Sequence, residues 1–211
     1  MAALRPHNPA PDGLFRAIKS ARRWQVWTLT PPLRGYVLGI IALAACATGF
    51  AIAHSHFEGS SWLLGVALLA CAIIAIESSR MVKEAHGEVV RDLNSVWLLA
   101  IAVALPPAFA FLAPIPLTAY KLLRIPGLVV YRRVFSAATI SLAYGGASVL
   151  FHAIPASVAG TYPGSGKHAL TWTASVAACG LLGWIVNHGL LVVAIKLSDP
   201  GARVRELIGS R

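Results

Sequence analysis

The sequence predicts an all-α protein: a polytopic helical bundle of six transmembrane segments with both termini in the cytoplasm. Of its 211 residues, 57% are apolar and only 12% are charged, whereas an ordinary soluble domain has about 25% charged residues. Long apolar runs alternate with short basic segments, as in membrane proteins. Lys and Arg number 18 against 8 Asp and Glu, and they lie mainly between the runs. This composition excludes a disordered chain and a disulfide-rich scaffold, and it argues against an ordinary soluble enzyme.

Four apolar runs predict four of the spans. They cover residues 35–53, 61–77, 134–153 and 169–195, and a helix of about 20 residues crosses a hydrocarbon core of about 30 Å. Pro31 and Pro32 precede the first run, and Ser60 or Ser61 is a good N-cap for the second. A charged connector, 78–94, follows the second run. The chain therefore divides into a basic arm (1–34), a membrane domain (35–196) and a cytoplasmic tail (197–211).

The remaining apolar segment, 95–123, admits two interpretations. It is too long for one simple span, and Pro106 and Pro107 divide it, with Pro114 and Pro116 further on. Because proline lacks a backbone N–H, the segment is either one kinked helix or a hairpin of two short helices. With a hairpin, 17 of the 18 Lys and Arg residues are cytoplasmic; with one helix, only 10 are. Cytoplasmic loops are enriched in these residues, so we expect the hairpin. Its first arm is short and needs shelter inside the bundle.

Small side chains at intervals of four residues predict close helix packing, within the bundle or in a homodimer. They occur in the first span at Gly35, Gly39, Ala45 and Gly49, and in the fifth at Ala137, Ser141 and Gly145. Cys46, Cys71 and Cys179 all fall in apolar runs, so we expect buried thiols without a disulfide.

The amino-terminal arm has two interpretations of equal standing. Leu14, Ile18, Ala21 and Trp24 are spaced by three or four residues, with basic residues between them. Such a pattern is typical of an amphipathic helix lying on anionic lipid. It is equally typical of a solvated basic segment that sets topology.

One candidate metal site lies on the predicted outer side, where histidines gather near the ends of three spans. The candidate ligands are His54, His56, Glu58, His152 and His168. Imidazole and carboxylate groups suit zinc or copper, and histidines could instead sense protons. Histidines in loops are more often simply hydrated. Metal binding, proton sensing and simple hydration therefore remain the three hypotheses for these residues.

Polar residues within or next to the spans form a second candidate site. They are Glu77, Asp92, Asn94, Asn187 and His188. Ionisable groups inside a membrane are costly and often functional, and His188 is the deepest of the five. Glu77 could instead pair with Arg80 one helical turn away.

The catalytic motifs sought in the sequence are absent. It has no Walker loop, G-x-S-x-G, H-E-x-x-H or C-x-x-C pattern. The cytoplasmic segments are too short for a catalytic domain with its own core. We therefore expect neither enzymatic activity nor a cofactor.

Several stretches resemble a known family. They are 92–97 (DLNSVW), 105–107 (LPP), 113–117 (APIPL), 131–137 (YRRVFSA), 145–148 (GGAS) and Phe151-His152. Together they resemble the amino-terminal multi-span region of actinobacterial signalling proteins, which precedes a cytoplasmic GGDEF or HD-type domain. The sequence contains no GGDEF, EAL or HD signature, so the resemblance implies no catalysis. It implies a sensory or anchoring module in a bacterial inner membrane.

Two functions follow as hypotheses. The first is a membrane sensor or anchor that signals to a cytoplasmic partner or output domain. The second is a small transporter or substrate-binding membrane subunit, suggested by the broken hairpin. The expected partners are the lipid bilayer, a cytoplasmic signalling protein and a second copy of the chain, and nucleic acid is not expected.

Overall fold

The computed structural model describes residues 25–86, 94–124, 129–155, 166–199 and 201, and within these ranges all regular structure is helical. The sequence-based prediction of an all-α fold is therefore confirmed. Four helices are long and apolar enough to cross a membrane. They are α2 (Pro31–His54), α3 (Gly59–His86), α7 (Val130–Ala153) and α9 (Lys167–Ser198). A short 3-10 turn, η1 (Gln25–Thr28), precedes them. These four helices correspond to the four predicted apolar runs and fit a membrane protein.

The helix ends follow from local sequence. Pro31 and Pro32 occupy the first turn of α2, where proline is tolerated because these N–H groups have no intrahelical acceptor. Gly166, at φ 60°, precedes α9 and adopts a conformation that favours glycine. Helix α3 continues to His86, so residues 78–86 of the predicted charged connector are helical. Lys, Glu, Met and Ala in this stretch are good helix formers, and charge alone does not end a helix where it leaves the membrane.

Three short helices occupy the proline-rich segment. They are α4 (Asn94–Ala104), α5 (Pro107–Leu112) and α6 (Pro114–Arg124). The backbone breaks at Leu105 and Pro106, and Pro106 is extended with ψ 147°. The end of α4 packs near Gly65 through Leu105, whereas the end of α6 reaches Glu77 through Arg124. From the end of α4 to the end of α6, the chain therefore runs alongside α3 from near Gly65 to near Glu77.

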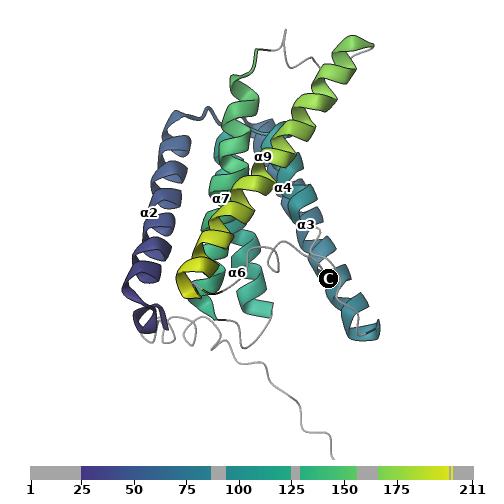
Figure 1. Ribbon diagram of the computed structural model, residues 1–211. Helices are drawn as coiled ribbons and strands as arrows, with labels where there is room; N and C mark the ends of the chain where they lie inside the picture. Colours follow the sequence, from purple (N-terminus) through teal and green to yellow (C-terminus); the bar gives the residue numbers. More distant parts are fainter. Residues whose placement is uncertain (1–24, 87–93, 125–128, 156–165, 200, 202–211) are drawn as a thin grey trace, which may run out of the picture.

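Helix α7 lies in the middle of the bundle, between α2 on one side and α3 on the other, with α9 crossing it (Figure 1). Half of the apolar 18-residue stretch of α7 is buried inside the protein, against 11% of the corresponding stretches of α3 and α9. On one side, Phe135 and Ala138 pack with Val37 and Ile40 of α2. On the other, Tyr144 joins a core with α4 and α5. Helix α7 therefore connects most of the other helices.

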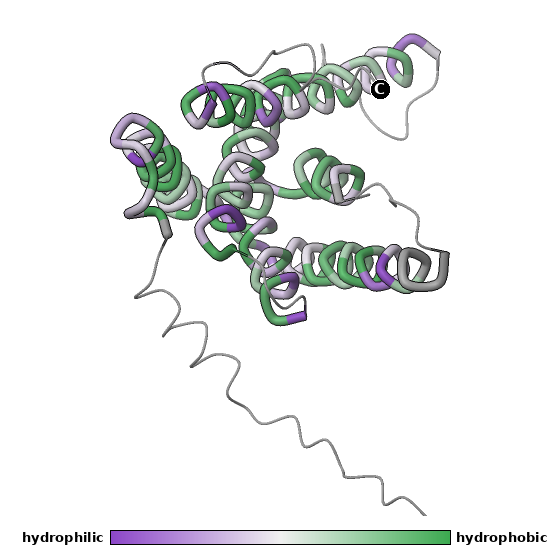
Figure 2. Tube along the Cα trace, turned by 60° about the horizontal axis from the view of Figure 1, so that its bottom comes forward, coloured by the Kyte–Doolittle hydropathy of each residue, from purple (hydrophilic) through white to green (hydrophobic). Residues whose placement is uncertain are grey.

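The helices are mostly apolar along their length (Figure 2), and many of their large apolar side chains are exposed. Phe50, Leu63 and Leu181 are 65%, 76% and 58% exposed. A soluble protein rarely exposes so much contiguous apolar surface, but lipid suits it. Cys46 and Cys71 are also exposed, and only Cys179 is buried. The expectation of three buried thiols is thus wrong for two of them, while all three are free.

Candidate functional site

The broken segment is held to α7 by two hydroxyl groups. The Ser148 hydroxyl donates to the carbonyl oxygen of Ala102 at 2.6 Å, and the Ser141 hydroxyl donates to that of Phe111 at 2.8 Å. Both serines are buried. In an unbroken helix, the carbonyl of Ala102 would accept from residue 106, but residue 106 is proline and has no N–H. Ser148 thus satisfies a carbonyl that the break at Pro106 leaves without its helical donor, and Ser141 adds a second hydrogen bond between α7 and the broken segment.

Two glycines let the aromatic side chains of α5 approach the neighbouring helices. A Cβ at Gly145 of α7 would lie well under 3.0 Å from the ring of Phe111. A Cβ at Gly65 of α3 would lie 3.1 Å from the ring of Phe109. Helix α5 therefore packs between α3 and α7, with Phe109 against Gly65 and Phe111 against Gly145.

A polar network joins α3 to α6 at the far end of the segment. One carboxylate oxygen of Glu77 accepts from the Tyr120 hydroxyl and from Nε of Arg124 at 3.2 Å. The other accepts from Arg80, whose nitrogens lie 2.9 Å away. The Glu77 side chain is 18% exposed. The i, i+3 pair with Arg80 that the spacing suggested thus exists, and two residues of α6 extend it.

An apolar cavity of about 200 Å³ lies between α3 and the broken segment. Trp62, Gly65 and Leu69 of α3 line one wall, and residues from α4 to α6, among them Leu105, Phe109 and Pro116, line the other. Almost no polar surface faces this cavity. It can hold an acyl chain or another apolar group, but it offers no hydrogen bonds to orient a polar ligand.

Comparison with protein-family models, with curated proteins and with solved structures finds no match to this chain.

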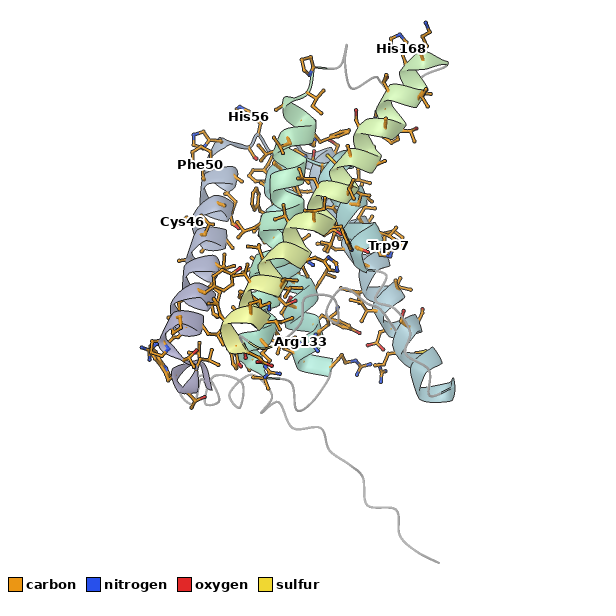
Figure 3. All side chains as sticks on the ribbon, in the orientation of Figure 1. Cys46, Phe50, His56, Trp97, Arg133 and His168 are labelled. Atoms are coloured by element: carbon orange, nitrogen blue, oxygen red, sulfur yellow. The ribbon has the colours of Figure 1, made fainter. Side chains whose placement is uncertain are left out.

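The structure does not bring the five candidate metal ligands together. In Figure 3, His56 lies by the turn after α2 and His168 lies at the far end of α9. Within the described residues, which include all five, no group of three or more His, Cys, Asp or Glu could hold a metal ion. His54 and His152 each use Nδ1 in a 2.9 Å hydrogen bond to the carbonyl four residues earlier. Glu58 is exposed and accepts from Ser60 at 3.5 Å.

The other predicted polar residues lie in separate places. His188 is exposed on α9, with Nδ1 2.9 Å from the carbonyl of Trp184 and its ring beside that indole. Asn187 is half-buried, and its Oδ1 is buried without a hydrogen-bond partner. Asn94 begins α4, and Asp92 lies outside the described residues. Among the members of this set whose side chains the structure describes, Glu77 alone belongs to a cluster.

The small residues at four-residue spacing are used for packing in α7 but not in the described contacts of α2. Ser141 and Gly145 of α7 face α5. A Cβ on Gly35, Gly39 or Gly49 of α2 would meet nothing within 4 Å, so among the described residues these glycines make no close helix contact.

Sequence reasoning did not single out Ser148, Phe109 or Phe111. A usable signal was present, since a proline at 106 leaves the carbonyl at 102 open and a membrane helix must then supply a donor. Ser141, Gly145 and Ser148 share one face of α7, and this small, polar face is the one that supplies the donors.

Proposed function

We propose that the chain crosses the membrane six times, with α4 as one arm and α5 and α6 as the other arm of a hairpin at Pro106-Pro107. The distribution of Lys and Arg supports this topology, because it leaves only Lys167 outside and puts both termini in the cytoplasm. The hydroxyl donors of α7 also support it, since a short helix within a membrane needs such shelter. The chain is then a multi-pass protein of the cell membrane.

We further propose that the chain is a sensory or anchoring module that transmits a signal to a cytoplasmic partner or output domain. The observation that carries this proposal is the position of α7, which holds α4 and α5 through Ser148 and Ser141 and packs along α9. A displacement of the hairpin therefore has a contiguous route through α7 to α9. The resemblance to membrane regions of signalling proteins agrees with this role, and no catalytic step is assigned to the chain.

The test joins a soluble reporter enzyme after Arg211 and measures its activity in membranes at equal abundance. Ser148→Ala releases the hairpin from α7, whereas Ser175→Ala removes a hydroxyl that bonds only within α9, to Thr171. We expect Ser148→Ala to change reporter activity about fivefold, the effect of about 1 kcal/mol on a two-state equilibrium. Ser175→Ala should leave it unchanged. Equal activity of all three proteins would overturn the sensory proposal.

The second candidate function is transport, and the apolar cavity beside the broken helix favours it. Transporter sites often lie where helices are interrupted, and Leu105 and Phe109 line the cavity at the break. The measurement is uptake of labelled apolar solutes by vesicles containing the purified chain. Val66→Trp, which enlarges an exposed side chain of the cavity wall, should abolish uptake if transport is the function. Vesicles without any uptake above protein-free controls would reject it.

A further inference from the structure

A second cavity, distinct from the apolar one, lies where α4, α6 and α7 meet. Its volume is about 80 Å³. Its polar wall consists of Thr118 and Lys121 of α6 and Arg133 and Ser136 of α7. Leu98, Leu117 and other apolar residues form the rest. Figure 3 shows Arg133 near the end of the bundle where α7 begins. Two cationic groups and two hydroxyls thus face one small space.

Arg133 differs from its neighbour Arg132. Arg132 is exposed, and it donates from Nε to the Tyr131 hydroxyl at 3.2 Å while its guanidinium lies 5.9 Å from that ring centre. Arg133 is half-buried and lines the cavity. Within the described part of the chain, its guanidinium has no hydrogen bond and no ion pair. A partly buried cation is stabilised by an anionic partner, and the cavity beside Arg133 provides a place for one.

The donor set matches one kind of anion. A guanidinium offers parallel N–H donors in a planar fork that fits phosphate oxygens, and an ammonium adds a mobile point charge. The two hydroxyls can each donate one further hydrogen bond. The volume exceeds the roughly 10–15 Å³ that a single water needs. The apolar wall lowers the local dielectric and strengthens the attraction between opposite charges.

We propose that this cavity, between Lys121 and Arg133, binds a phosphate group. The group comes from an anionic lipid headgroup or from a soluble phosphate compound, since both present the same oxygens. The general excess of basic residues near cytoplasmic loops does not account for the arrangement, because it asks only for charge near the interface. A general excess of charge does not require Arg133 and Lys121 to line the same cavity. The proposal holds whether the chain signals or transports.

The test is thermal unfolding of the purified full chain in two settings. In the first, the chain is in an uncharged detergent, and inorganic phosphate is compared with chloride at equal ionic strength. In the second, the chain is in phosphatidylcholine nanodiscs with or without phosphatidylglycerol. A ligand that binds only the folded state raises the unfolding temperature. We expect phosphate, phosphatidylglycerol or both to raise it for the natural chain.

The matched variants are Arg133→Gln and Arg132→Gln, which have the same net charge. Arg133→Gln should weaken the apparent affinity about tenfold or more, the effect of losing a charge-assisted hydrogen bond, whereas Arg132→Gln should not change it. If Arg133→Gln does not fold, Lys121→Gln and the double variant Thr118→Val/Ser136→Ala replace it, with the same expectation.

The outcomes separate the two sources of phosphate. Stabilisation by phosphatidylglycerol alone identifies a lipid headgroup, and stabilisation by inorganic phosphate identifies a soluble ligand. Equal stabilisation of both arginine variants would mean general attraction to the basic face and would overturn the site. The absence of stabilisation by either probe would overturn it as well.

Discussion

The hydroxyl of Ser148 on α7 donates a 2.6 Å hydrogen bond to the carbonyl oxygen of Ala102 on α4. Ala102 stands four residues before Pro106, so its own helix cannot supply the donor. The hydrogen bond therefore repairs, between two helices, a gap that proline makes within one.

Replacing Ser148 by alanine should reveal the cost of that open carbonyl. We expect a loss of about 1–2 kcal/mol of unfolding free energy, above the roughly 0.6 kcal/mol average for membrane hydrogen bonds, because the helical donor to this carbonyl is replaced by Pro106. Denaturation in mixed micelles measures it. Ser175→Ala, which removes a hydroxyl bonded only within α9, should change the free energy by less than about 0.5 kcal/mol. Similar losses in both variants would show that the Ala102 carbonyl finds another partner.

Two adjacent glycines of α7 should respond oppositely to alanine. At Gly145 the added methyl group meets the ring of Phe111, and overpacking of this kind costs about 1–3 kcal/mol. At Gly146 the methyl group meets nothing within 4 Å. Gly146→Ala should therefore be neutral or stabilise the helix by about 0.5–1 kcal/mol. Thermal unfolding of the two variants in one detergent makes the comparison, and equal behaviour would contradict the close contact of α5 with α7.

Glu77 should hold the end of α6 against α3. In Glu77→Gln the neutral amide no longer pairs as an anion with Arg80 and Arg124, so we expect faster amide hydrogen exchange in residues 114–124. Glu58→Gln is the control, because Glu58 is exposed and bonds only to nearby Ser60. Unchanged exchange in Glu77→Gln would mean that apolar packing alone positions α6.

The proposed topology predicts which engineered cysteines face outward. In a variant whose three native cysteines are alanine, Ser60→Cys and His168→Cys should react with a membrane-impermeant maleimide added to intact cells. Ser198→Cys should react only after permeabilisation. Labelling of Ser198→Cys but not of His168→Cys in intact cells would instead support five spans, with 95–123 as one kinked helix.

The sequence predicts the long helices well and their packing poorly. Apolar runs located α2, α3, α7 and α9, and the prolines located the break after α4. The runs did not show which face of each helix meets protein, because lipid tails are as apolar as a protein core. Cys71 and Ala72 illustrate this, since both lie in the same apolar run and only Ala72 is buried.

The candidate site was predictable only where local chemistry required it. Glu77 and Arg80 share a helix, so their spacing alone suggested the pair. Tyr120 and Arg124 join them from 43 and 47 residues away, and no local pattern contains that approach. The histidines gave a misleading signal, because nearness to the same membrane face does not bring side chains within reach of one ion.

The bond between Ser148 and Ala102 also sets an order of events during synthesis. Ala102 leaves the ribosome 46 residues before Ser148. At about 5–20 residues per second, this delay lasts roughly 2–9 s. Throughout that time the nascent α4 carries a carbonyl that lipid cannot satisfy. If the proposed six-span topology holds, this cost favours keeping residues 94–124 within the insertion machinery until α7 arrives.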